Sequence, residues 1–156
     1  VENIIRIGSA GSYRDWLKVM DVTLAEVAVS ESSYALVQGG CKDNAIKPSQ
    51  ELNDVIKAKA KEIGIECTPS VVHSSDVFYR DASQGTWQDI IKQNGSDCVE
   101  MESFALFHNA NMTGKRAACL LTISDSFVDH TELSAEDRQN SFTKMMTLAL
   151  ESAIVL

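Results

Sequence analysis

The segment from Ala117 to Ile123 constrains the fold of this chain more than any other stretch. It consists of seven consecutive apolar or β-branched residues, the composition of a strand that is covered on both faces. Such strands occur in largely parallel sheets with helices packed on either side. The segment therefore predicts an α/β fold with this strand at the centre of the sheet.

Strand-like and helix-like segments alternate along the rest of the chain, as in α/β domains. We expect strands at Ile4–Ile7, Val22–Val29, Ile65–His73 and Cys98–Val99, and helices at Ser49–Gly64, Thr86–Gln93, Glu102–Asn111 and from Ser134 onward. The first strand is expected to be short and buried and to end in a glycine loop, Gly8–Ser12. Pro69 predicts an edge position or an irregular stretch, because proline has no N–H to donate. With no repeat or linker, residues 1–156 are predicted to form a single domain with a mixed, mostly parallel central sheet flanked by helices.

Charge and cysteine spacing exclude several classes of protein. The 156 residues include 14 basic and 22 acidic side chains, a net charge of −8, without a basic run. We therefore expect no nucleic-acid partner, since such binding depends on Lys and Arg. The four cysteines form no zinc or redox motif. Without a recognisable signal peptide or an apolar run near the ~20 residues of a membrane span, the chain is expected to be cytoplasmic and free of membrane contact.

Polar residues gather after three of the predicted strands, where open α/β sheets bind their ligands. The first group is Arg6-Ile7-Gly8-Ser9, followed by the rest of the glycine loop. Loop amides, a hydroxyl and a guanidinium together suit an anion such as phosphate. A plain turn, with Arg6 paired to an acid, is the alternative interpretation.

The second group is Glu100-Met101-Glu102, whose two carboxylates are expected to point the same way. Carboxylates accept paired hydrogen bonds, so they suit the adjacent hydroxyls of a sugar. The alternative is that Glu100 is solvated and that Glu102 favours the start of the next helix.

The third group is Ser124-Asp125-Ser126, directly after the longest apolar strand. An unpaired acid at such a position would be costly, so Asp125 is expected to be paired or used. Arg138, thirteen residues later, is a candidate partner. A helix-capping or turn aspartate is the alternative.

In this order, the three groups resemble the bacterial-type purine nucleoside phosphorylases, the hexameric branch of the nucleoside phosphorylase family. The matching segments are IIRIGSAGS, DVFY, VEMES, TISDS and SAEDRQNSF, from Ile4 to about Leu150. The VEMES segment alone is shared with uridine phosphorylases and methylthioadenosine nucleosidases. The combination of the SD dipeptide with the later Glu-Asp-Arg-Gln segment resembles the purine phosphorylases in particular.

The resemblance implies reversible phosphorolysis of purine (2′-deoxy)ribonucleosides to a free purine and (deoxy)ribose 1-phosphate, with phosphate as co-substrate and no metal or cofactor. By position, it implies that phosphate is bound by Arg6, Ile7, Gly8 and Ser9, ribose by Glu100, Met101 and Glu102, and the base by Ala10, Gly11, His73, Val99 and Ser124. Asp125 would be the general acid that protonates N7 of the purine, and Arg138 would assist it.

Some features depart from the family pattern. His73 stands where the family usually has an aromatic residue stacked on the base, and a satisfied strand-end histidine is the alternative. Ser126 stands where histidine is common, and Ser30–Asp43 is less basic. The family's N-terminal strands and their phosphate donors have no counterpart, so the chain is expected to be the C-terminal two-thirds of such a protein.

The partners expected from the resemblance are a purine nucleoside, phosphate, further copies in a homo-oligomer arranged as a trimer of dimers, and a separate N-terminal segment of the same protein. Two other functions remain open. One is a nucleosidase that uses water, although water does not require the guanidinium of Arg6. The other is a non-catalytic fragment that binds purine nucleosides.

Overall fold

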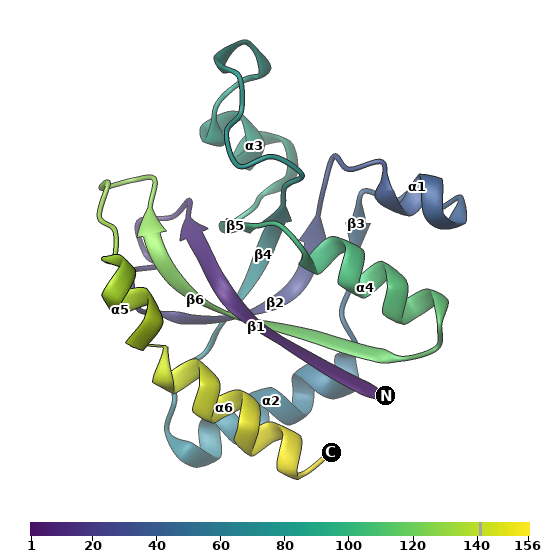
Figure 1. Ribbon diagram of the computed structural model, residues 1–156, viewed down its shortest axis with the longest axis vertical. Coiled ribbons are helices and arrows are strands. Elements are labelled where there is room, and N and C mark those ends of the chain that lie inside the picture. The colour runs from purple at the N-terminus through teal and green to yellow at the C-terminus, as the bar shows by residue number, and fades with distance from the viewer. Residues whose placement is uncertain (141) are drawn as a thin grey trace.

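Strands and helices alternate along the chain around a central mixed sheet (Figure 1). The computed structural model describes residues 1–140 and 142–156. The strands in these ranges are β1 (Asn3–Ser12), β2 (Val22–Val29), β3 (Ala45–Ile46), β4 (Thr68–Ser74), β5 (Cys98–Glu100) and β6 (Arg116–Ser126). The α-helices are α1 (Tyr34–Gly39), α2 (Gln50–Ile63), α3 (Trp87–Asn94), α4 (Ser103–Met112), α5 (Ala135–Asn140) and α6 (Thr143–Ile154), and a 3-10 turn spans Ala82–Gln84.

The described strands form one sheet in the order β3-β2-β4-β5-β1-β6. The longest pairings, β1 with β6 and β2 with β4, are parallel, as is β4 with β5. The β1–β5 and β2–β3 pairings are antiparallel. β2 also pairs with β6, so the sheet curls until strands that are distant in its order meet. The predicted α/β fold with a mixed, mostly parallel sheet is confirmed.

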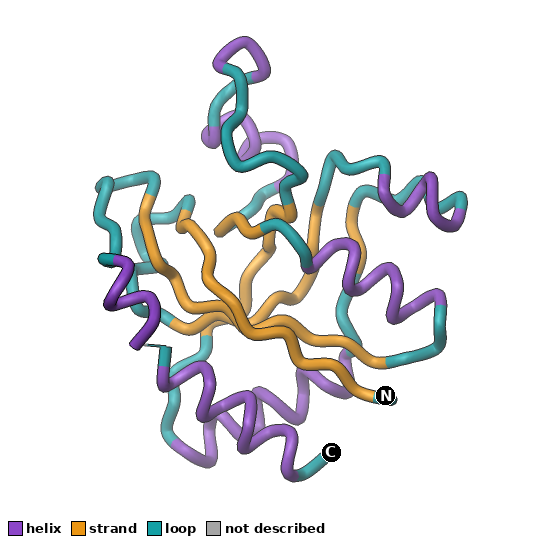
Figure 2. The backbone as a smooth tube through the Cα atoms, viewed as in Figure 1, coloured by secondary structure: helices purple, strands orange, loops and turns teal. Residues whose placement is uncertain are grey.

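Helices cover both faces of the sheet (Figure 2). On one face, α4 contributes Phe107 to an apolar cluster that includes Leu121 of β6. On the other face, α2 and α6 pack together, and Leu148 joins a second cluster that includes Leu120. Successive residues of β6 therefore pack into the clusters on opposite faces of the sheet, because side chains alternate along a strand. This arrangement confirms the prediction that the segment Ala117–Ile123 is covered on both faces.

The helix signals read from the sequence correspond closely to the ends of α2 and α3. Ser49 caps α2 and accepts a hydrogen bond from the Leu52 amide, and Gly64 ends the helix with a φ of 69°. Thr86 and Gly95 occupy the equivalent positions around α3. These ends depend on local backbone chemistry, which is why the sequence predicts them well.

β1 is longer and more exposed than expected. It extends to Ser12, and Ile4 and Ile7 are 39% and 44% exposed. The strand extends this far because β1 pairs with β6 over its whole length, which makes the two glycines strand residues. The prediction of a short buried strand that ends in a glycine loop was therefore wrong.

β4 lies inside the sheet, between β2 and β5, so the edge position suggested by Pro69 was wrong. Pro69 is tolerated because it pairs with Leu24 of β2 at a point where β5, which begins opposite Val72, has not yet joined. The alternative expectation, an irregular stretch, is confirmed by a register shift in β2 between Ala25 and Val27.

The single C-terminal helix expected from Ser134 onward is instead two helices, α5 and α6. Ser134 accepts a hydrogen bond from the Asp137 amide, as the capping pattern predicts. The second helix begins after Phe142, whose side chain packs against the core between α2 and α6. None of the helices in the described ranges is long and apolar enough to cross a membrane.

Candidate functional site

Arg6 lies at the centre of an ion-pair cluster between β1 and the start of α4. Its guanidinium contacts the carboxylate of Glu102, and its Nη1 lies 3.5 Å from Glu100 Oε2. A Cβ on residue 8 would lie 2.5 Å from Arg6 Nη1, so Gly8 leaves room for the folded guanidinium. The structure thus brings the arginine expected to bind phosphate against both carboxylates expected to bind ribose.

Glu100 and Glu102 have different environments although both reach Arg6. Glu100 is buried, and its carboxylate accepts hydrogen bonds from the amides of Glu102 and Ser103 and from the Ser103 hydroxyl, at 2.6–3.1 Å. It therefore orders the first turn of α4, and the alternative of a solvated Glu100 was wrong. Glu102 is exposed, as is Met101 between them, so its carboxylate is the one accessible to a sugar.

Asp125, near the end of β6, forms the expected pair with Arg138. Arg138 Nη2 lies 3.9 Å from Asp125 Oδ1, and the Ser124 hydroxyl donates to the same oxygen at 2.7 Å. Both members of the ion pair are partly exposed. A Cβ on residue 11 would come within 2.8 Å of Asp125 Oδ2, so Gly11 gives the carboxylate its space.

Three of the expected site residues form one row across the sheet. Gly11 of β1 pairs with Val99 of β5 on one side and with Asp125 of β6 on the other. Glu100 directly follows Val99 in the chain, which connects this row to the Arg6 cluster. The positions expected to bind the base, to bind the ribose and to supply the acid therefore meet at one end of the sheet, where α/β sheets bind their ligands.

The expected phosphate-binding residues divide between the two faces of β1. Arg6 points toward α4 and shares that face with Gly8, where a Cβ would meet its guanidinium, whereas Ile7 and Ser9, together with Arg138, line a cavity of about 500 Å³ on the α6 side. The division follows from the extended backbone, because successive side chains of a strand alternate. Ala10 is buried next to them on the α4 side.

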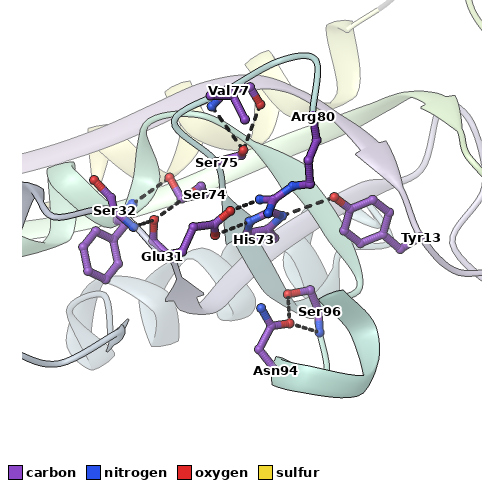
Figure 3. Close-up of polar contacts among 12 residues, drawn as sticks. Tyr13, Glu31, Ser32, His73, Ser74, Ser75, Val77, Arg80, Asn94 and Ser96 are labelled. Carbon is purple, nitrogen blue, oxygen red and sulfur yellow. Dashed lines mark hydrogen bonds and ion pairs between the residues drawn. The ribbon is translucent and has the colours of Figure 1, made fainter. Parts of the chain in front are cut away.

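His73 is enclosed by partners rather than presented to a cleft. It is 1% exposed, its Nδ1 lies 3.2 Å from the Tyr13 hydroxyl, and its Nε2 lies 2.8 Å from a Glu31 carboxylate oxygen (Figure 3). Because an ionised carboxylate can only accept, Nε2 carries the proton and the Tyr13 hydroxyl donates to Nδ1. The contacts are those of a satisfied strand-end histidine, and base binding by His73 stays a prediction.

Aromatic residues that the sequence did not single out lie beside the row. Phe127 would come within 2.7 Å of a Cβ on Gly11, and its ring meets that of Tyr13 edge-on at 5.2 Å. Trp87 stacks on Tyr13 at 6.0 Å and lies 6.4 Å from Phe127, so the three rings form one cluster. These residues come from three separate loops and strand ends, so no sequence spacing could have grouped them.

Burial lowers the pKa of His73 from its ordinary 6.5, and the charge of Glu100 only partly opposes this effect. Glu31 also faces the ring, but it is exposed and pairs with Arg80, and Tyr13 contributes a neutral hydroxyl. Below this ordinary pKa the unfolded chain binds a proton that the folded protein does not, so the free energy of unfolding decreases as the pH falls. We expect the melting temperature to fall more steeply between about pH 7.5 and 5.5 in the parent protein than in His73→Gln.

The matched control is His130→Gln, which changes an exposed histidine outside this network. Its melting temperature should keep the slope of the parent protein over the same pH range. Equal slopes for the parent and His73→Gln would show that His73 does not contribute.

A family model described as the phosphorylase superfamily matches residues 1–154. The chain belongs to the phosphorylase superfamily. Among its curated relatives in this superfamily, a DeoD-type purine nucleoside phosphorylase from Mycoplasma genitalium is 40% identical over 97% of this chain and 63% of that protein. The corresponding protein from Bacillus subtilis is 37% identical over 97% of this chain and 64% of its own length. The phosphorylase-superfamily chain thus spans somewhat less than two thirds of these relatives.

Solved structures share the superfamily fold. A Campylobacter jejuni 5′-methylthioadenosine/S-adenosylhomocysteine nucleosidase has a TM-score of 0.86 at 19% identity, covering 100% of this chain and 70% of that one. A Toxoplasma gondii purine nucleoside phosphorylase in complex with immucillin-H has a TM-score of 0.84 at 20% identity, covering 97% and 62%. At these identities the likeness concerns the fold.

Proposed function

We propose that the protein acts as a purine nucleoside phosphorylase, a transferase that moves a (deoxy)ribosyl group between a purine and phosphate. The observation that carries the proposal is the contact between Arg6 and Glu102 at the end of the sheet where Asp125 lies. An anion-binding group, a sugar-binding group and an acid are what the reaction requires in one place. The names of the relatives support the same activity.

The adjacency of Arg6 and Glu102 fits the geometry of phosphorolysis. A phosphate oxygen forms a bond to the anomeric carbon of ribose while the bond from that carbon to the purine nitrogen breaks, so phosphate and sugar must touch. Before substrates bind, the carboxylates neutralise the guanidinium. We propose that phosphate then binds Arg6. The ribose hydroxyls replace Arg6 as hydrogen-bond donors to Glu102, so that neither charged group is left without a partner.

Asp125 would act on the leaving base. The electron pair of the breaking bond moves onto the purine, and a proton delivered to N7 makes the base a neutral leaving group. A nearby cation opposes this role, because it favours the ionised carboxylate. The 3.9 Å separation and partial exposure make the Arg138 pair a weak one. We propose that Arg138 closes after the substrate binds and stabilises Asp125 as its proton departs.

The open edge of β1 supports a further strand as a partner. Within the described residues, β1 has a neighbour on its second edge only at Gly11 and Ser12, where it meets β5. Beside this edge runs an apolar groove of about 520 Å³, whose lining includes Ile5, Ile7 and Leu150. Exposed strand edges of this kind accept extended apolar segments. We propose that the occupant is an N-terminal segment belonging to the part of the full-length protein that this chain, spanning 63–64% of its relatives, does not include.

The resemblance also supports a homo-oligomer built as a trimer of dimers, and a cytoplasmic location. Sedimentation of the purified protein, alone and with the part of the Mycoplasma genitalium relative that this chain does not match, tests both the assembly and the strand partner. A complex that forms only with that part, and is lost in Ile7→Asp, is the expected result. No complex with the added part would contradict the strand proposal.

Phosphate dependence decides between the candidate reactions. Purine release from inosine and adenosine is followed with and without phosphate, and the sugar product is identified by phosphorus NMR. Phosphate-dependent release with ribose 1-phosphate is the expected result. Release of free ribose without phosphate would indicate a nucleosidase, and calorimetric binding without release would indicate a non-catalytic binding fragment.

A further inference from the structure

The loop between β4 and α3 begins at the candidate site. Its first residue, Ser75, donates its amide to the carbonyl of Glu100 at 2.9 Å, and Ser74 accepts a hydrogen bond from the Phe104 amide. The loop then carries two large aromatic side chains into solvent, Phe78 at 77% and Tyr79 at 89% exposure. The two rings contact each other at 4.9 Å, and neighbouring exposed apolar groups of this kind are candidate binding surfaces.

Arg80 binds this loop to another part of the chain. It is the single basic residue between Ser75 and Thr86, and its guanidinium contacts the carboxylate of Glu31, in the segment after β2 (Figure 3). The same carboxylate accepts from His73 Nε2 at 2.8 Å. Glu31 therefore contacts the buried His73 of β4 through one carboxylate oxygen and Arg80 of the loop through the other.

The contacts continue from His73 to the row of site residues. Tyr13 donates to His73 Nδ1, and its ring lies against Phe127, which is adjacent to Gly11 and Asp125. Hydrogen-bond donation in the network converges on Glu31, which accepts from Arg80 on one side and from His73 on the other, while His73 accepts from Tyr13. Each partner therefore fixes the orientation of the next, which is how polar networks specify one geometry.

We propose that Arg80 and Glu31 are positioning residues that hold the 75–86 loop so that Phe78 and Tyr79 close over the purine base. This inference rests on the proposed function, because it assigns a base to the neighbouring site. Aromatic faces stack on any purine. Ordering a loop when a ligand binds costs free energy. Because the pair fixes the loop beforehand, that cost is avoided and the nucleoside binds more tightly. The pair of Arg80 and Glu31 is separate from Arg6 and Asp125, so we expect phosphate binding and protonation of the base to stay unchanged.

The test compares Arg80→Ala, Glu31→Gln and the double variant with Arg116→Ala. Arg116 is a matched control, because it pairs with an exposed Glu51 at 3.0 Å where β6 begins, away from the loop. We expect KM for the nucleoside to rise about fivefold in each network variant, the upper range for an exposed ion pair. KM for phosphate and kcat should stay near the parent values, Arg80→Lys should restore part of the loss, and the double variant should be no worse than the single ones.

A second readout does not depend on catalysis. Chymotrypsin cleaves after exposed aromatic residues, so cleavage at Phe78 and Tyr79 should be faster in Arg80→Ala than in Arg116→Ala. In a Trp16→Phe background, acrylamide quenching should report greater access to Trp87, which stacks on Tyr13. Cleavage and quenching equal to the control would overturn the proposal, as would a faster cleavage that leaves nucleoside KM unchanged.

The outcomes for the loop and for the reaction are distinguishable. If no nucleoside is cleaved, the proposed function fails, and adenine binding measured by calorimetry replaces KM. Weaker adenine binding in Arg80→Ala, together with faster loop cleavage, would then still support the positioning role. Unchanged adenine binding would overturn it.

Discussion

We expect Asp125→Asn to lower kcat for inosine phosphorolysis by about 10²-fold or more, the usual contribution of a general acid, with a smaller effect on nucleoside KM. Asparagine has nearly the same shape, so it can keep the hydrogen bond from Ser124 and the close contact with Gly11. It cannot deliver a proton to the purine, so the base must leave as an anion. Steady-state kinetics at saturating phosphate measures the effect.

A substrate whose base needs no proton provides the sharpest control for this prediction. In 7-methylguanosine the purine is already cationic, so Asp125→Asn should cleave it at nearly the parent rate. Asp129→Asn, which alters an exposed acid nearby in the chain, should leave both substrates unaffected. Full activity of Asp125→Asn on inosine would remove Asp125 from the mechanism.

The second large effect is expected at Arg6. Each hydrogen bond between a charged donor and phosphate is worth about 1.5–3 kcal/mol, so Arg6→Met should raise KM for phosphate by roughly 10- to 100-fold. Arg6→Lys keeps the charge without the two-pronged donor and should fall between the parent and Arg6→Met. Phosphate titrations at saturating nucleoside measure the change.

The loss of Arg6 also leaves the buried carboxylate of Glu100 without its nearby cation, so stability must be measured in parallel. Circular dichroism melting separates a folding defect from a binding defect. Arg14→Met is the matched control, since Arg14 forms a comparable ion pair with Asp97 at 2.9 Å. If phosphate KM in Arg6→Met equals that in Arg14→Met, Arg6 does not bind phosphate.

The elements that depend on local chemistry were predictable from the sequence. The bounds of β2 and the caps of α2 follow from patterns within a few residues. The exposure of β1 could not be predicted, because it depends on which strands pair with it and not on its own composition. The exposure of both Ile4 and Ile7 is therefore a property of the sheet.

In the candidate site too, contacts between residues close in the chain were predictable, and contacts that depend on the assembled sheet were not. The pair between Asp125 and Arg138 was predictable because the two residues are close in the chain and an acid after a buried strand requires a partner. The surroundings of His73 were not, since its partners lie 60 and 42 residues away and only the assembled sheet brings them together. Family resemblance pointed to Arg6 and Glu102 separately, and the structure adds that they touch.

The curled sheet has one further consequence. Its two halves, β3-β2-β4-β5 and β1-β6, are joined along β5–β1 by only two residue pairs and along β2–β6 by three. The row through Val99, Gly11 and Asp125 crosses the shorter of these seams. A molecule bound across this row would contact both halves at once, at a seam where only two residue pairs join them. If the proposed nucleoside binds along this row, we expect its binding to stabilise the sheet at this seam.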